Sequence, residues 1–173
     1  SGAGGEQVLT ITAPTFTATA VDGYTSSVSY ALALVGPTAT GLETTAGNHA
    51  ITLVGSGALI SGMYDSNGDG TLDATAFTVT LSGNQVTLTS LEALEHSNAP
   101  QGAGEDNTLD LNGLVNVVAT VTVTDGDNDQ VVASQATASP LSLTFDDTDP
   151  TLVIDTAPTL GALEVVEASG AGG

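Results

Sequence analysis

The chain of 173 residues has no cysteine, lysine, arginine or tryptophan. Without cysteine, neither a disulfide framework nor a thiolate metal site can form. Without lysine or arginine, no side chain can displace counterions from phosphates, which excludes nucleic acid and anionic membrane surfaces as partners. Only three Phe and three Tyr are present, so platforms that stack on sugar rings are scarce. No apolar run approaches the length of a transmembrane helix, which argues against direct membrane insertion.

What the chain does have is acid: its 20 Asp and Glu residues give a formal net charge of -20. Two carboxylates about 5 Å apart repel each other by roughly 1–3 kcal/mol at effective dielectric constants of about 80 to 20. Because the chain supplies no cation, its acidic clusters must be solvated, kept apart or paired with metal ions from outside. A mean hydropathy of +0.23 and 40% apolar residues nevertheless favour a folded domain over disorder.

Strand patterns cover most of the chain, because apolar residues alternate with Thr and other polar residues. The predicted strands are residues 8–12, 15–19, 28–35, 50–54, 76–81, 85–89, 115–124, 131–136, 141–145 and 152–154. Ser82-Gly83-Asn84 predicts a hairpin turn. Residues 90–96 combine good helix formers with a Ser cap and predict one to two helical turns. We therefore expect an all-β, Ig-like antiparallel β-sandwich with one short helix near residues 90–96.

The two ends of the chain share a sequence, since Ser-Gly-Ala-Gly-Gly at residues 1–5 recurs at residues 169–173. One interpretation is a shared linker composition; the other is one repeat of a tandem array, cut from a longer protein. In the second, residues 1–5 are a linker, residues 6–155 are the sandwich repeat, and residues 156–173 are a linker and a strand leading into the next repeat. Each repeat then has an unpaired edge that accepts a strand from a neighbour.

The strongest chemical motif is the acidic loop, residues 65–73, which reads Asp-Ser-Asn-Gly-Asp-Gly-Thr-Leu-Asp. Its candidate Ca²⁺ ligands, at positions 1, 3, 5, 7 and 9 of an EF-hand-like spacing, are Asp65, Asn67, Asp69, Thr71 through its carbonyl, and Asp73. Ala76 stands at position 12, where an EF-hand requires a bidentate Glu, so the loop is not an EF-hand. A Ca²⁺ site and a metal-free Gly/Asp-rich turn both remain open.

Two further acidic clusters lie at predicted turns or edges. Residues 125–129 read Asp-Gly-Asp-Asn-Asp, and residues 146–150 read Asp-Asp-Thr-Asp-Pro. Their candidate metal ligands are Asp125, Asp127, Asp129, Asp146, Asp147 and Asp149. Asp and Asn favour turns even without metal, so a plain hairpin turn is an equal alternative for the first cluster. The second would chelate Ca²⁺ between successive modules or form a solvated linker.

Residues for catalysis are few. His49 and His96 are the only histidines, and both lie near predicted turns, where a structural imidazole is the simplest interpretation. No nucleophile elbow, helical zinc pair or phosphate-cradling glycine loop occurs. Paired carboxylates hydrolyse glycosides in some enzymes, but the scarcity of aromatic residues argues against a sugar cleft. We predict that the protein is not an enzyme.

A series of short stretches resembles the repeat (extender) module of large bacterial repeats-in-toxin (RTX) adhesins. In order, they are residues 30–34, 41–44, 51–54, 65–73, 77–79, 86–88, 91–96, 111–114, 121–127 and 143–147. The resemblance spans about residues 22–154. Two motifs depart from the family pattern. Residues 125–129 have Asn128 in place of the second Gly of an expected Asp-Gly-Asp-Gly-Asp, and residues 146–150 read Asp-Asp-Thr-Asp-Pro where such modules often have Asp-Asp-Asp-Gly-Pro. Both keep their carboxylates.

The resemblance implies an Ig-like extender that is exported by type I secretion and stiffened by Ca²⁺ outside the cell. The expected protein is a structural repeat unit of a long secreted adhesin or filament at the bacterial surface, serving cell adhesion or biofilm formation. Its expected partners are similar repeats in tandem or in a polymer, with glycans bound through other domains. The alternative is a calcium-dependent carbohydrate-binding module, which needs an aromatic or amide-rich site beside residues 65–73, where only Tyr64 is adjacent.

Overall fold

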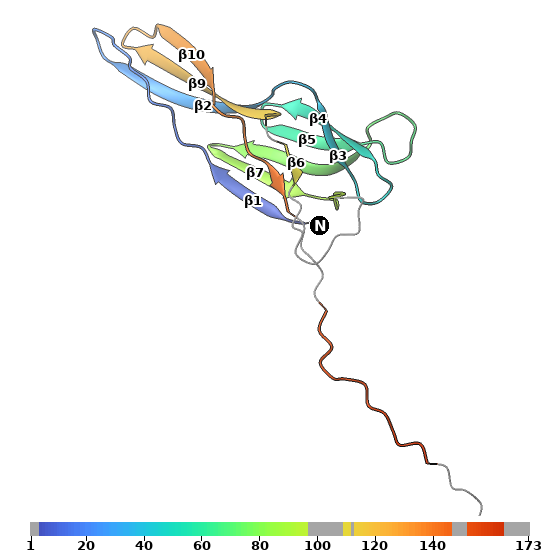
Figure 1. The fold of residues 1–173 in the computed structure, drawn as a ribbon. Coiled ribbons are helices and arrows are strands. Elements are labelled where there is room, and N and C mark those ends of the chain that lie inside the picture. The colour runs from blue at the N-terminus through green and yellow to red at the C-terminus, as the bar shows by residue number, and fades with distance from the viewer. Residues whose placement is uncertain (1–3, 97–108, 112, 147–151, 165–173) are drawn as a thin grey trace, which may run out of the picture.

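The computed structural model describes residues 4–96, 109–111, 113–146 and 152–164, and every regular element within them is a β-strand (Figure 1). All strand pairs are antiparallel, so the predicted all-β antiparallel fold is confirmed. The strands are β1 (Glu6–Thr10), β2 (Tyr24–Leu34), β3 (Ala39–Glu43), β4 (Ala50–Ser56), β5 (Leu59–Tyr64), β6 (Ala74–Ser82), β7 (Gln85–Ser90), β8 (Leu109–Asp110), β9 (Val115–Asp125), β10 (Gln130–Ala136) and β11 (Thr144–Phe145). Among the described residues, no helix is long and apolar enough to cross a membrane.

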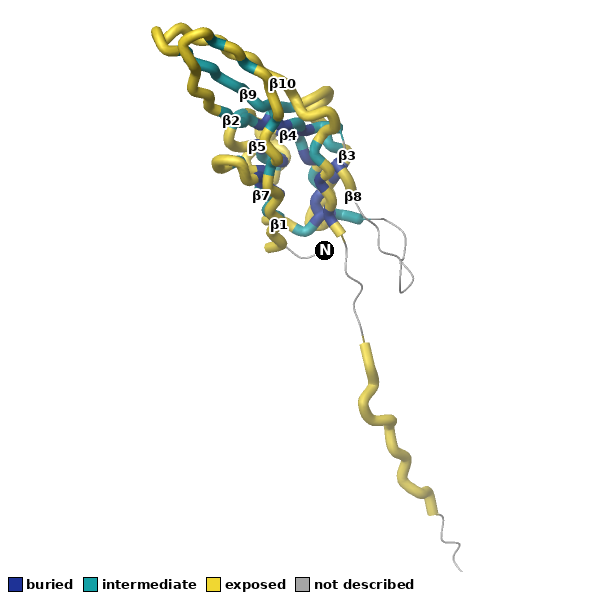
Figure 2. The backbone as a smooth tube through the Cα atoms, turned by 90° about the vertical axis from the view of Figure 1, so that its left-hand side faces the viewer, coloured by how far each residue is buried: buried dark blue, intermediate teal, exposed yellow. Residues whose placement is uncertain are grey.

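The strands form a six-stranded sheet in the order β1-β7-β6-β5-β4-β3, a three-stranded sheet in the order β10-β9-β2, and the pair β11-β8. The two larger sheets share one hydrophobic core, seen as the dark blue stretches of Figure 2. The three-stranded sheet contributes Leu32, Val115 and Val117, and the six-stranded sheet contributes a larger set that includes Ile60 and Phe77. Alternation along each strand places these apolar residues on the inner faces.

A β-bulge in β6 explains why Ala76 and Phe77 are both fully buried although they are consecutive. The register between β5 and β6 shifts between Gly62 and Met63, which leaves Ala76 as an extra residue in its strand. The Phe77 ring lies over Gly62, where a Cβ atom would overlap it. It also packs against Phe145 of β11, with ring centroids 5.0 Å apart, and so joins β11 to the six-stranded sheet.

The predicted short helix near residues 90–96 is wrong. The N–H groups of Leu91 and Glu92 both donate to the carbonyl of Ala76, at 2.8 and 3.0 Å, because the bulge leaves that carbonyl outside the strand ladder. Leu94 is 1% exposed and belongs to the core. The backbone donors of the expected first turn are therefore bound to a neighbouring strand, and tertiary contacts override the helical propensity.

Of the other predictions, the hairpin turn is confirmed and two of the strands are wrong. The hairpin at Ser82-Gly83-Asn84 is confirmed, with Ser82 paired to Gln85 and Gly83 at a φ of 58°. Residues 15–19 and 152–154 are not strands, since they have no partner strand in the described part of the chain. Conversely, β3 and β5 were not predicted from the sequence. Their short alternations are broken by Gly41 and Gly62.

Candidate metal centre

The acidic loop (residues 65–73) connects β5 to β6 and is organised around the Asp65 carboxylate. That carboxylate accepts hydrogen bonds from the backbone N–H groups of Asn67, Gly68 and Gly70, at 3.2, 2.7 and 2.7 Å. Gly68 and Gly70 have φ values of 79° and 87°, which few other residues adopt without strain. The Gly70 N–H is the main reason that the pKa of Asp65 lies below its ordinary value of 3.8, and the N–H groups of Gly68 and Asn67 add to it.

The remaining side chains of the loop are bonded in the same way. Asn67 Oδ1 accepts the Asp69 N–H at 2.9 Å, and Asp69 Oδ1 accepts the Thr71 N–H at 2.8 Å. The Asp73 carboxylate accepts the Ser66 N–H at 2.8 Å and the Asn67 side-chain amide at 3.1 Å. The predicted ligands of this loop therefore come together, but their oxygens are aimed at neighbouring N–H groups.

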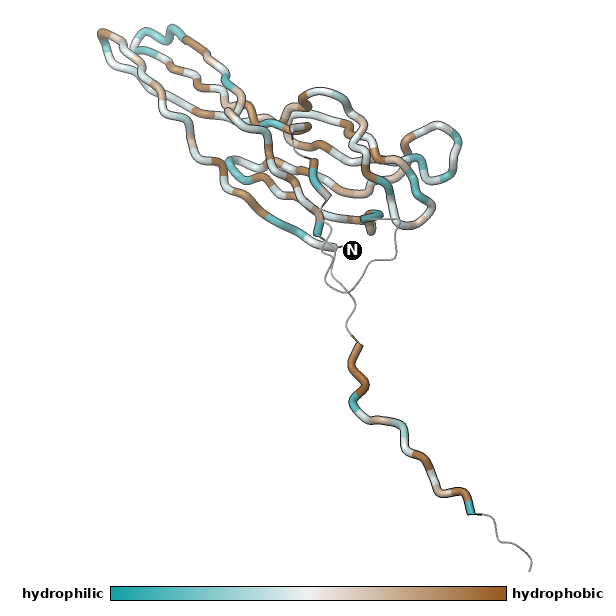
Figure 3. Tube along the Cα trace, viewed as in Figure 1, coloured by the Kyte–Doolittle hydropathy of each residue, from teal (hydrophilic) through white to brown (hydrophobic). Residues whose placement is uncertain are grey.

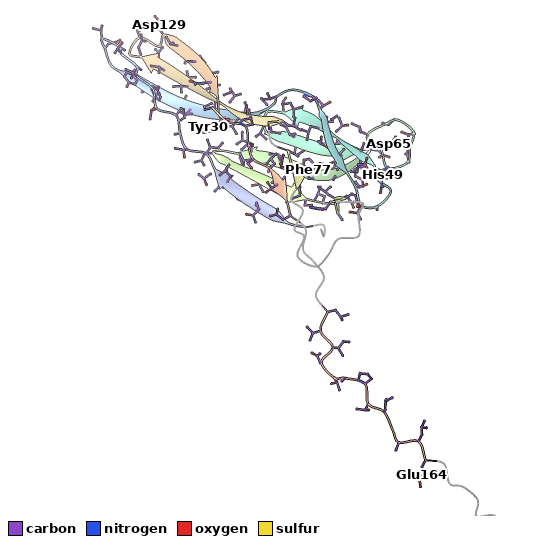
Figure 4. The ribbon with its side chains drawn as sticks, in the orientation of Figure 1. Tyr30, His49, Asp65, Phe77, Asp129 and Glu164 are labelled. Atoms are coloured by element: carbon purple, nitrogen blue, oxygen red, sulfur yellow. The ribbon has the colours of Figure 1, made fainter. Side chains whose placement is uncertain are left out.

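The second acidic region lies at the far end of the three-stranded sheet. Here the carboxylate oxygens of Asp22, Asp125 and Asp127 lie within 4.8 Å of one another. We call this group the acidic tip. Within the described residues, it is the one group of three acidic or histidine side chains close enough to share a metal ion. Figure 4 shows Asp129, next to the tip, and Asp65 at opposite ends of the folded body.

Strand pairing explains how the acidic tip is assembled. Tyr24 at the start of β2 pairs with Asp125 at the end of β9, which brings the turn before β2 beside the β9–β10 hairpin. Gly126 faces the Asp22 carboxylate, and a Cβ atom at this position would overlap that side chain. Asn128 completes the hairpin turn with a φ of 72°, a conformation that Asn tolerates better than most residues.

The Asp125 carboxylate is the most enclosed of the three, since it is half-buried while Asp22 and Asp127 are exposed. Hydrogen bonding with the Asp127 side chain, and then with the Asp129 N–H at 2.9 Å, holds the pKa of Asp125 below its ordinary value of 3.8. Asp125 is therefore ionised at neutral pH. Oxygen ligands in a charged, partly open group of this kind suit a hard cation such as Ca²⁺.

The other predicted ligand residues are not part of the acidic tip. Asp129 bonds to Asp125 through its backbone, and its carboxylate is not part of the group of three. Asp146 is exposed directly after β11. Asp147 and Asp149 lie outside the described residues, so the proposed edge cluster is not tested. Thr71 takes part through its N–H, which donates to Asp69 Oδ1.

Asp22 is the ligand candidate that sequence reasoning missed. It precedes Gly23, and an Asp-Gly pair reads locally as a turn. Only the pairing of β2 with β9 brings it to residues 125–127, which are more than one hundred positions away in the chain. A prediction that β2 pairs with β9 would have identified Asp22 as a candidate ligand.

Comparisons with known proteins identify the chain only at the level of a family. The family described as Domain of unknown function (DUF5801) matches residues 4–136. The matched region runs through β1 to the end of β10 and so includes both larger sheets and the acidic tip. No curated protein and no solved structure matches the chain.

Proposed function

We propose that this chain, which belongs to the DUF5801 family of domains of unknown function, is a structural unit of a long extracellular adhesin or filament, stabilised by Ca²⁺. The observation that carries the proposal is the acidic tip, where three carboxylates converge in a chain without a single lysine or arginine. The chain has no lysine or arginine to neutralise them. A cation from the surroundings is therefore the natural partner, and Ca²⁺ is abundant outside cells.

An Ig-like β-sandwich is the finer fold that we propose for this unit. In support, two antiparallel sheets share one core, and the main strands are linked largely by short turns. The ordered resemblance to RTX adhesin repeats, noted above, supports the same fold, export from a bacterium and a location at the cell surface. The lack of cysteine is compatible with an extracellular protein that uses metal ions instead of disulfides as staples.

A structural role is favoured over catalysis by the surroundings of the polar residues. His49 is stacked on Tyr64, with ring centroids 5.5 Å apart and 28° between the ring planes, as in a packed structural pair. Burial raises the pKa of Tyr64, with further contributions from the Glu92 and Asp73 carboxylates. These contacts give Tyr64 a structural role beside the acidic loop.

The same contacts weigh against the carbohydrate-binding alternative. That alternative needs an aromatic or amide-rich site near residues 65–73, and the aromatic ring beside the loop is that of Tyr64. Tyr64 is only 9% exposed, and His49 covers part of its ring. A sugar held by a metal ion in this loop would therefore not be able to stack on the Tyr64 ring.

Thermal unfolding in Ca²⁺, compared with Mg²⁺ at equal concentration, tests the proposal. A single site with free Ca²⁺ at 10–100 times its dissociation constant adds about 1.4–2.7 kcal/mol of stability. In a domain of this size, that corresponds to a rise in Tm of about 3–10 °C. Equal shifts in both ions would indicate charge screening alone, and the calcium-stabilised unit would then be rejected.

A further inference from the structure

The outer half of the three-stranded sheet has an apolar inner face that no second sheet covers. Val117 and Val121 point to the same side of β9, because side chains of a strand alternate. Val117 is 2% exposed in the shared core. Val121, further towards the acidic tip, instead lines an open groove of about 610 Å³ together with Ala133 of β10 and Tyr30 of β2.

The opposite wall of this groove is the segment of residues 11–19, which leads from the end of β1 towards the acidic tip (Figure 1). Its sequence alternates as in a strand, and the sequence predicted a strand at residues 15–19. Among the described residues, however, no backbone group of residues 12–19 makes a hydrogen bond to another backbone group. The segment thus has backbone groups that an added strand can bind.

The same chain carries a segment suited to be that neighbour. Residues 152–164, which we call the tail, run away from the folded body, and every one of them is exposed (Figure 2). Figure 3 shows hydrophobic stretches along the tail. Its large apolar side chains are almost completely exposed, with Leu152 at 90%, Leu160 at 98% and Leu163 at 101%. Such exposure is costly in water unless the side chains become buried elsewhere.

Charge favours another copy of this chain as the partner of the groove. None of the residues that line the groove is charged, and the tail contains two acids, Asp155 and Glu164, the second at its end. In a chain with a formal net charge of -20, these two surfaces are the ones that approach each other with little repulsion.

The tail and the groove also lie at opposite ends of the molecule. Gly5 and Glu6 line a small cavity together with Phe145 and Asp146, so the tail leaves the body beside the N-terminal strand. Residues 11–19, which line the groove, instead lead towards the turn before β2, at the other end (Figure 1). A donor at one end and an acceptor at the other make a head-to-tail contact, which extends into a filament wherever its rotation does not close into a ring.

We infer that the groove between residues 11–19 and the three-stranded sheet binds the tail of a second copy as an added β-strand. The tail pairs with the free backbone of residues 15–19 and buries its apolar side chains against Val121 and Ala133. This inference deepens the proposed function and rests on it, because it takes the partner to be another structural unit of the same kind.

Self-association of the full chain tests the inference, with sedimentation velocity in EDTA up to about 1 mM protein, the range in which contacts of millimolar affinity are populated. Val131→Asp places a charge in the groove, and Val132→Asp is its matched control on the opposite face of β10. Both positions are exposed, at 71% and 58%, so both variants should fold. In the tail, Ile154→Asp removes an apolar contact, and Val153→Asp adds the same charge on the opposite face of the added strand.

The expected result is association of the wild type that Val131→Asp and Ile154→Asp each weaken by roughly ten- to a hundredfold, the loss that follows when one apolar side chain is no longer buried. Val132→Asp and Val153→Asp should associate like the wild type. An equimolar mixture of Val131→Asp and Ile154→Asp should form a one-to-one dimer, since one variant keeps its tail and the other its groove.

Three results would overturn the inference. They are a wild type that stays monomeric throughout the range, association that is equally sensitive to Val131→Asp and Val132→Asp, and association that does not depend on Ile154. A monomer whose tail occupies its own groove falls under the first result. Because EDTA is present throughout, failure here leaves the calcium proposal standing, and failure of the Ca²⁺ unfolding test leaves this result standing.

Discussion

The acidic loop at residues 65–73 and the acidic tip use the same residue types in different ways. In the loop, the Asp65 carboxylate is surrounded by N–H donors at 2.7–3.2 Å. At the tip, the carboxylates of Asp22, Asp125 and Asp127 face one another instead. The Asp125 carboxylate also accepts backbone N–H groups, among them that of Asp129 at 2.9 Å, but it has two further carboxylates within 4.8 Å. We therefore expect the tip to bind Ca²⁺ more tightly than the loop, although the loop has the more familiar spacing of ligands.

The largest expected effect that separates the two regions is on Ca²⁺ affinity. Asp127→Asn removes one charged ligand from the tip, and we expect the affinity to fall by roughly tenfold or more, as for other losses of metal-site groups. Asp69→Asn, the matched change in the loop, should leave the affinity nearly unchanged. Isothermal titration calorimetry measures both. A larger loss in Asp69→Asn would reverse the comparison.

A smaller effect on affinity is expected from Gly126→Ala. The added Cβ overlaps the Asp22 carboxylate, so Asp22 must move away from its two partners and Ca²⁺ should bind several-fold more weakly. Gly126 does not have a left-handed backbone conformation, so the hairpin itself should remain intact. Gly5→Ala, where the new Cβ meets nothing within 4 Å, is the control. Unchanged affinity in Gly126→Ala would show that Asp22 is not a ligand.

Without divalent ions, neutralising the two regions should change stability in opposite directions. Asp127→Asn relieves repulsion at the tip and should raise Tm by roughly 1–3 °C, the scale of an exposed charge interaction in a domain of this size. Asp65→Asn weakens the hydrogen bonds to Asn67, Gly68 and Gly70 and should lower Tm. Thermal unfolding in EDTA measures both shifts. Shifts of the same sign would contradict the distinction between the regions.

The smallest expected effect is the loss of the Asp65 hydrogen bonds in the acidic loop at low pH. The pKa of folded Asp65 lies below 3.8, so its hydrogen bonds contribute stability that is present above this value and is lost as the pH falls through the folded pKa. The Gly70 amide signal in NMR spectra should therefore shift below pH 3.8. The Gly83 amide, in a turn without a carboxylate, serves as the control. A Gly70 midpoint above 3.8 would contradict the proposed bonding.

The sequence predicts the strands of this fold better than their partners. Alternation identifies β9, which has an apolar face that includes Val117 and Val121 and a more polar opposite face. It fails at residues 15–19, where the pattern is that of a strand but the described chain offers no neighbour. It also fails at residues 90–96, because the carbonyl of Ala76, freed by a bulge, binds the local donors. These outcomes depend on which segments meet, and a single sequence does not encode that locally.

The candidate metal site was also predictable from the sequence only in part. Asp125 and Asp127 are evident from their spacing in a hairpin turn, and the structure brings them together. Asp22 joins them only through the pairing of β2 with β9. The loop of residues 65–73 has the spacing of a metal site, yet its backbone folds back onto its own side chains. Spacing reveals which residues are available, and the pairing of distant strands determines which carboxylates converge.

The most direct test of the account is a Ca²⁺ titration followed by NMR, with backbone amides assigned. If the acidic tip is the calcium site, the amides of Asp22 and of residues 125–127 will shift first and saturate together, while those of residues 65–73 change little. Shifts that begin in residues 65–73, or that spread evenly over all acidic segments as with Mg²⁺, would contradict it.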